Sequence, residues 1–162
     1  MTFVPRPGSR SGDAERMDMD RIIVGVDGSP SSIAALKYAA RLAQALHAPL
    51  EAVTTWTYPP MTGAELVIEW QPEQDAQQIL DQSVVAAFGD APPDALTRTV
   101  LSGPPARTLI DLSETAGMLV LGSRGRGGFA GLLLGSVSAS CASHAHCPVL
   151  IMHSDDDETD RG

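Results

Sequence analysis

The sequence predicts an α/β fold, in which a doubly wound, five-stranded parallel sheet carries helices on both faces. Short apolar runs rich in Val, Ile and Leu alternate with longer segments whose apolar residues recur at helical spacing. Strands that alternate with helices favour parallel pairing, because each helix carries the chain back before the next strand begins. Most of the expected strands are apolar throughout, which is typical of a sheet buried on both faces.

The first expected strand is "RIIVGVD" at residues 21–27, a continuous β-branched run. In the "GSPSS" that follows, Ser29 is placed to cap a helix and Pro30 suits its first position. Apolar residues at helical spacing extend this helix to about residue 47. The segments that follow are a strand, an irregular surface loop and a helix, at residues 50–56, 57–72 and 72–88.

The second half of the chain repeats the alternation of strand and helix. Residues 95–103 alternate in polarity as a strand does, and residues 104–117 form a helix that starts with proline and ends at glycine. The apolar strand at 118–123 leads directly into a glycine-rich stretch. A last helix at 135–146 and a strand at 147–153 complete the alternation.

The chain has 162 residues, which suits one domain with a core of ordinary size. We expect this domain at residues 20–153, between a disordered N-terminal arm at 1–19 and a disordered acidic tail at 154–162. A membrane-spanning helix would need about 18 consecutive apolar residues, and no such run is present. There is also no apolar stretch suited to a signal peptide, and the two cysteines do not form a disulfide framework. We therefore expect a cytoplasmic protein.

The charge is −9 overall, which argues against general binding of nucleic acid. The acids are unevenly placed, and none lies between Thr115 and Ser154. Arg124 and Arg126 lie in this acid-free part, inside the glycine-rich stretch, which favours binding of a small anion. Four possible zinc ligands lack the usual ligand spacing, so that packing is favoured over a metal site for Cys141, His144, His146 and Cys147.

The glycine-rich stretch "GSRGRGGFAGLLLGS" (122–136) holds six glycines in fifteen residues. A flexible surface loop is one reading. However, the stretch follows a buried strand and ends in Gly-Ser at a helix start, where unpaired N–H groups favour phosphate. Gly125, Gly127 and Ala130 match a dinucleotide fingerprint, but the required acid about 20 residues further on is missing. A Walker loop is excluded because the single lysine, Lys37, lies in the first expected helix.

A third reading is a family resemblance. Gly122, Gly125, Gly135 and Ser136 form the pattern G-x2-G-x9-G-S. Together with "VGVDGSPSS" and "SGPPARTLIDLS", this pattern resembles the ATP-binding branch of the universal stress protein family. The likeness covers about residues 20–153.

The resemblance implies a Rossmann-like sheet of order 3-2-1-4-5 that binds ATP, with Mg²⁺ on the phosphates. It places Gly122 and Gly125 beside the ribose and phosphates, and Gly135 and Ser136 on the phosphates. Asp27 would face the ribose and the phosphate-bound metal, while adenine would lie against residues 54–56. The candidate cofactor-binding residues are Asp27, Gly28, Ser29, Thr55, Gly122, Ser123, Arg124, Gly125, Gly135, Ser136, Val137 and Ser138.

Several of these residues have a second reading. Asp27 precedes Gly-Ser-Pro and could simply cap the following helix. Arg124 and Arg126 suit phosphate, yet arginines in loops often face solvent. Ser138 is a further candidate for a phosphate contact, although small residues in helices also serve packing.

The expected function is that of a nucleotide-responsive regulator in a stress or dormancy response, a role that the resemblance implies. Hydrolysis would need a base beside the phosphates, and the glycine-rich stretch holds no His, Glu or Asp. We therefore expect no catalytic residues and slow or no turnover. The resemblance also implies a homodimer, for which the apolar strand at Pro148–Met152 offers an edge. Two alternatives stay open: a dimeric interaction module that binds a protein partner without ATP, and a cyclic-AMP binder of the same fold.

Overall fold

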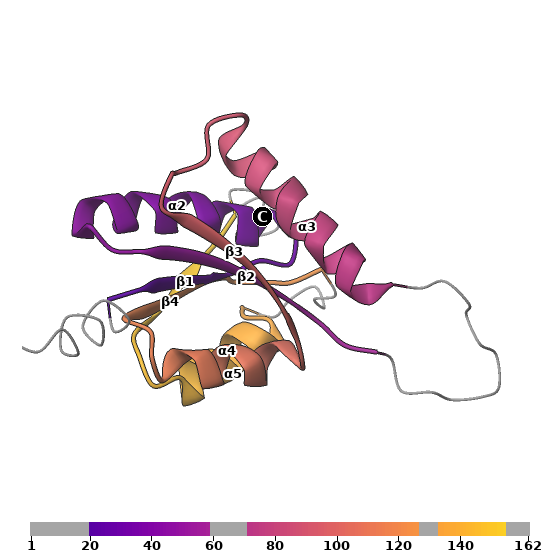
Figure 1. The fold of residues 1–162 in the computed structure, drawn as a ribbon. Coiled ribbons are helices and arrows are strands. Elements are labelled where there is room, and N and C mark those ends of the chain that lie inside the picture. The colour runs from indigo at the N-terminus through magenta and orange to yellow at the C-terminus, as the bar shows by residue number, and fades with distance from the viewer. Residues whose placement is uncertain (1–19, 59–70, 127–132, 155–162) are drawn as a thin grey trace, which may run out of the picture.

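A computed structural model describes residues 20–58, 71–126 and 133–154, and these form one parallel sheet flanked by helices (Figure 1). The strand order is β3-β2-β1-β4-β5, and every pairing is parallel. The elements in chain order are β1 (Ile22–Gly25), α2 (Pro30–Leu46), β2 (Leu50–Trp56), α3 (Pro72–Phe88), β3 (Leu96–Ser102), α4 (Pro105–Ser113), β4 (Met118–Gly122), α5 (Ser136–His144) and β5 (Val149–Met152). The predicted fold class and strand order are confirmed.

Several expected segments lie outside the described residues. They are the N-terminal arm, nearly all of the acidic tail, most of the loop at 57–72 and the middle of the glycine-rich stretch. Within the described ranges, no helix is long and apolar enough to cross a membrane.

The helices cover both faces of the sheet, with α2 and α3 on one face and α4 and α5 on the other (Figure 1). Each face has its own core because neighbouring strand residues point to opposite sides. Ile22 and Val24 pack with the α2 and α3 side chains, whereas Ile23 packs beneath α4 and α5. This alternation explains why β1 is apolar at every position.

The ends of α2 follow from local chemistry. Ser29 caps the helix by accepting a 3.2 Å hydrogen bond from the N–H of Ser32, and Pro30 occupies the first turn, as predicted. The helix ends at Leu46, and its C-cap residue His47 adopts a left-handed backbone conformation with φ of 53°.

The helix α4 is shorter than predicted, since it ends at Ser113 and not at residue 117. The N–H groups of Glu114 and Thr115 bond to carbonyl groups three residues earlier, at 3.3 Å each. Hydrogen bonds to the third preceding carbonyl, in place of the fourth, tighten the winding of the last turn and end the helix. The helix α5 likewise ends at His144, and every strand except β2 is one to three residues shorter than its predicted run.

The sheet reverses its direction of growth between β1 and β4. The chain moves outward from β1 through β2 to β3, and then returns to place β4 on the other side of β1. Ligands in open α/β sheets bind at such a switch point, beyond the carboxyl ends of the strands. The two stretches singled out in the sequence, after β1 and after β4, both begin there.

Candidate functional site

A cleft of about 460 Å³ opens at the carboxyl ends of β1, β2 and β4. Its lining comes from strand ends, helix starts and the glycine-rich loop, and consists of residues 25–27, 29, 32, 53–55, 79, 105, 109, 121–122, 124–126 and 135–138. Because α2, α4 and α5 all begin at this edge, the positive ends of three helix dipoles face the cleft.

One wall is the turn between β1 and α2. Asp27 Oδ1 accepts a 2.9 Å hydrogen bond from the N–H of Ser29. The Ser32 hydroxyl donates to the Ser29 carbonyl at 3.0 Å and accepts from the N–H of Asp27 at 3.4 Å. These contacts fix the turn and leave the Asp27 carboxylate facing the cleft. The cap of α2 is therefore the Ser29 side chain, and Asp27 holds the N–H of that N-cap residue.

The opposite wall is the entry of the glycine-rich loop, which several elements hold in place. The N–H of Ser123 donates to Met152 O at 2.7 Å, and Ser123 O accepts from the N–H of Gly135 at 2.7 Å. The Ser138 hydroxyl donates to Gly122 O at 2.6 Å. The Ser138 proton is thus engaged by the loop backbone, which ties α5 to the end of β4.

The start of α5 is open toward the cleft. In the described residues, no side chain caps this helix, and Gly135 stands at its N-cap with extended backbone angles. Ser136 is exposed, whereas Ser138 is buried. A Cβ atom at Gly135 would make only ordinary contacts, the nearest at 3.5 Å from Arg124 Cα. Uncapped N–H groups beside an accessible backbone suit an anion.

The glycines at this edge serve different purposes. A Cβ at Gly122 would lie 2.7 Å from the backbone C of Ser31 and N of Ser32, so this glycine lets α2 pack on the end of β4. A Cβ at Gly125 would lie 2.7 Å from Asp27 Oδ2. Both glycines also line the cleft, so these packing contacts are compatible with their predicted place beside the ligand.

Two kinds of chemistry meet in the cleft. Arg124 and Arg126 line it on the loop side, and Asp27 is the one acid among the described lining residues. The floor beneath is apolar, formed by Val53, Ile79, Leu109, Leu121 and Val137. A ligand with an anionic part and a flat apolar part fits such a division.

All but two of the candidate residues line the cleft. Gly28 does not line it; this residue sits in the turn at φ of +81°, where a Cβ would meet the Arg126 guanidinium at 2.6 Å. Ser123 does not either, since it is fully buried between β5 and the N-cap of α5. The sequence analysis missed Ser32 as a residue that lines the cleft, although "SPSS" carries its hydroxyl close to Asp27.

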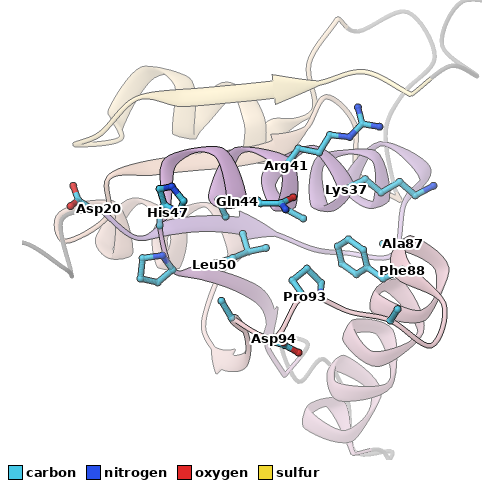
Figure 2. Close-up of a pocket in the computed structure, with 16 residues that line it drawn as sticks. Asp20, Lys37, Arg41, Gln44, His47, Leu50, Ala87, Phe88, Pro93 and Asp94 are labelled. Carbon is cyan, nitrogen blue, oxygen red and sulfur yellow. The ribbon is translucent and has the colours of Figure 1, made fainter.

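A larger hollow of about 1040 Å³ lies at the opposite, amino-terminal edge of the sheet (Figure 2). Leu50 opens β2 there, while His47 and Phe88 mark the ends of α2 and α3. Helix C-termini carry partial negative charge, which disfavours phosphate. Lys37 and Arg41 line one rim of this hollow from the middle of α2. Because helix C-termini face this hollow, whereas helix N-termini face the smaller cleft, the smaller cleft is the candidate nucleotide site.

The cysteines and histidines near the C-terminus form no metal centre in the part of the chain that the structure describes, where no three His, Cys, Asp or Glu residues are grouped to hold an ion. Both cysteines are free. Burial, together with the neighbouring Cys147, raises the pKa of Cys141 to about 11. Burial also raises the pKa of Cys147. Cys141 is a core residue of α5, and Cys147 is partly buried against the same core.

Comparison with known families gives a match to the universal stress protein family over residues 19–153. A universal stress protein of Mycobacterium tuberculosis strain H37Rv is 34% identical, over 83% of this chain and 48% of the relative. The chain spans about half the length of the curated relatives it matches.

Two solved structures illustrate the likeness in three dimensions. A universal stress protein in complex with cAMP is 28% identical with a TM-score of 0.64, over 84% of this chain and 98% of that one. The universal stress protein from Archaeoglobus fulgidus in complex with dAMP is 20% identical with a TM-score of 0.60, over 82% and 97%. At its lower identity, the second shows a shared fold.

Proposed function

The chain belongs to the universal stress protein family, and from this premise we propose that its cleft binds ATP with Mg²⁺. Bound nucleotide would make the protein a regulator in a stress or dormancy response in the cytosol. The observation that carries the proposal is the open start of α5 beside the glycine-rich loop. Both line the same cleft, and no described side chain caps the helix.

The phosphates would lie at this helix start. The N–H groups of Ser136 and Val137 and the exposed Ser136 hydroxyl would donate hydrogen bonds to phosphate oxygens. Arg124 and Arg126 would supply positive charge from the loop. An acidic protein of net charge −9 otherwise repels a polyanion, so cations at the cleft are needed for affinity.

The adenine would lie on the apolar floor near the end of β2. Val53, Thr54 and Thr55 line the cleft there, whereas Trp56 packs edge-on against Tyr58 with ring centroids 5.3 Å apart. Thr54 donates its hydroxyl to Val26 O at 2.8 Å, which joins the ends of β1 and β2 beneath the base. The cAMP complex of a 28% identical relative supports an adenine nucleotide as ligand class.

Asp27 fits Mg²⁺ that arrives with the phosphates. Its Oδ1 holds the N–H of Ser29, and Oδ2 faces Gly125 across the cleft edge. Carboxylate oxygens are the ligands that Mg²⁺ prefers, usually together with phosphate oxygens and water. When bound, the ion would neutralise phosphate charge close to this carboxylate.

Turnover would be slow or absent. Hydrolysis needs a base that activates water in line with the scissile bond. Asp27 is the one acid among the described lining residues, and its carboxylate already holds the α2 turn. The nucleotide then acts as a bound signal.

A second copy of the chain would complete the assembly through β5. Among the described strands, β5 pairs only with β4, and its four apolar residues are all half-buried. An edge of this kind favours pairing with another strand. The same edge favours the alternative function, a dimeric module that binds a protein partner without nucleotide.

Titration calorimetry on the full chain, stripped of co-purified nucleotide, tests the proposal. We expect saturable binding of Mg-ATP, and weaker binding of ATP in EDTA because Asp27 then meets phosphate without a cation between them. No heat from any nucleotide would overturn the proposal and favour the interaction module. Saturation by cAMP but not by Mg-ATP would replace ATP with the cyclic nucleotide.

A further inference from the structure

The backbone of residues 122–124 is held from three sides before any ligand arrives. Its contacts to β5 and α5 pass through Ser123 N, Ser123 O and Gly122 O. The third side is α2, from which the Ser31 hydroxyl donates a 2.6 Å hydrogen bond to Arg124 O. The same hydroxyl accepts a longer contact of 3.4 Å from the N–H of Arg124. Ser31 is thus the described side chain that holds both backbone polar groups of Arg124.

Ser31 is placed for contact with the loop and away from the ligand. It is 3% exposed and does not line the cleft, whereas Arg124 does. The absence of a side chain at Gly122 makes the approach possible, since a Cβ there would lie 2.5 Å from Ser31 Oγ. The cap of α2 is the Ser29 hydroxyl, which accepts from the N–H of Ser32 and lies 3.5 Å from Ser31 Oγ, so Ser31 is a neighbour of the cap and does not itself supply it.

We infer that Ser31 is a positioning residue of the nucleotide site, which fixes the Arg124 backbone, and with it the loop entry, in the shape that receives phosphate. This inference rests on the proposed function. Ser31 acts through Arg124 and touches no ligand. The hydroxyl couples the first turn of α2, which also carries the Asp27 turn, to the loop that faces it.

Loss of this contact should weaken nucleotide binding, because the loop would then lose conformational entropy when the ligand binds. A preorganised loop binds more tightly because it has little conformational freedom left to lose. Removing one buried hydrogen bond that orders a binding loop is expected to weaken affinity roughly tenfold. Exchange of the Arg124 N–H with solvent should also become faster, because the Ser31 hydroxyl no longer accepts a hydrogen bond from it.

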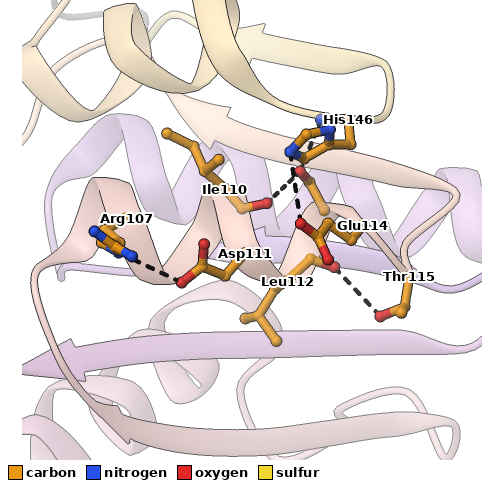
Figure 3. Close-up of polar contacts among 8 residues, drawn as sticks. Arg107, Ile110, Asp111, Leu112, Glu114, Thr115 and His146 are labelled. Atoms are coloured by element: carbon orange, nitrogen blue, oxygen red, sulfur yellow. Dashed lines mark hydrogen bonds and ion pairs between the residues drawn. The ribbon is translucent and has the colours of Figure 1, made fainter.

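Ser113 provides a matched control at the end of α4, where its partners Ile110 and His146 lie (Figure 3). It is 1% exposed, donates to Ile110 O at 2.5 Å and accepts from the N–H of His146 at 2.8 Å. It therefore bridges α4 to the segment before β5 as Ser31 bridges α2 to the loop. Ser113→Ala removes a hydroxyl of similar burial and bonding, but outside the cleft.

The experiment compares the full-length wild type, Ser31→Ala and Ser113→Ala by Mg-ATP calorimetry, thermal unfolding and amide hydrogen exchange. Both variants should lower the melting temperature, whereas only Ser31→Ala should weaken Mg-ATP binding roughly tenfold and speed exchange at Arg124. Should Ser31→Ala not fold, Ser31→Cys keeps the side-chain shape with a weaker donor and should move both readouts in the same direction.

The outcomes separate this inference from the proposed function. Equal affinities for wild type and Ser31→Ala would overturn the inference and leave nucleotide binding in place. Equal losses of Mg-ATP affinity in Ser31→Ala and Ser113→Ala would overturn the inference too, because general destabilisation of the fold would then explain both losses. If the wild type does not bind Mg-ATP, the proposed function is wrong. Independently of nucleotide binding, an unchanged rate of hydrogen exchange at Arg124 in Ser31→Ala would overturn the positioning role of Ser31.

Discussion

Asp27 and Gly125 meet across the carboxyl edge of the sheet, so closely that a Cβ atom at residue 125 would lie 2.7 Å from Asp27 Oδ2. The other carboxylate oxygen accepts from the N–H of Ser29 at 2.9 Å. The Asp27 side chain thus bonds to the N-cap residue of α2 and lies against the loop that follows β4. A change at residue 125 is therefore expected to act through Asp27.

Gly125→Ala should displace the Asp27 carboxylate, because the new methyl group cannot share its position. We expect a loss of about 1–3 kcal/mol in the free energy of unfolding, together with weaker Mg-ATP binding. Denaturant unfolding of a double-mutant cycle with Asp27→Ala measures the coupling. In the Asp27→Ala background the cost of Gly125→Ala should largely vanish. Strictly additive costs would show that the two residues do not interact.

Gly122→Ala should damage the fold itself. The added Cβ would press on the backbone of Ser31 and Ser32 at 2.7 Å, where backbone atoms give way less easily than a flexible side chain. We expect a loss of about 3 kcal/mol in the free energy of unfolding, at the upper end for overpacking. Urea denaturation measures this loss, and wild-type stability in the variant would contradict the close packing of α2 on β4.

Arg126→Gln should weaken Mg-ATP binding about fivefold and flatten its dependence on salt, because one cation facing the phosphates is lost. Calorimetry at two ionic strengths measures both effects. Arg107→Gln removes the same charge from the exposed face of α4, where Arg107 pairs with Asp111 at 3.8 Å. Equal effects of the two substitutions would show that only net charge matters.

The buried thiol of Cys141 should make the protein less stable in alkali. Burial raises its pKa from about 9 to about 11, so the folded state holds the proton more tightly than the unfolded state does. The resulting stability is complete below pH 9 and is lost as the pH rises toward 11. The expected loss is about 1 kcal/mol at pH 10.

Urea denaturation at pH 8, 9 and 10 measures this dependence for the wild type and for Cys141→Ala. The variant lacks the titrating thiol, so its free energy of unfolding should change less over this range. Parallel curves for the two proteins would assign the alkaline instability to other groups.

The sequence predicted the architecture well because each element carries a local signal. The β-branched run of β1, the Ser29 cap with Pro30, and the proline that opens α4 all act within a few residues. The early end of α4 had no such signal. It depends on bonds from Glu114 and Thr115 to carbonyls three residues back, whereas Gly117 suggested a later end.

The location of the site could be predicted from the sequence, but the separate roles of its residues could not. Ten of the twelve candidate residues line the cleft, since chemistry at strand ends converges on one edge of a parallel sheet. The role of Ser31 depends on its contact with Arg124, which lies 93 residues away in the sequence. No local sequence pattern predicts such a contact. The packing role of Gly122 was hidden for the same reason, because its neighbours belong to α2.

The central claim is that phosphates bind at the start of α5, and Gly135→Ala tests it most directly. Gly135 has φ of −70° and room for a Cβ, so the methyl group should disturb the fold little while it shields the uncapped helix start. The decisive measurement is calorimetric titration of the wild type and the variant with Mg-ATP, once thermal unfolding has shown that their melting temperatures are the same. We expect saturable binding by the wild type and at least a tenfold loss of affinity, roughly 1.4 kcal/mol, in the variant. Binding of equal strength by both proteins would contradict it.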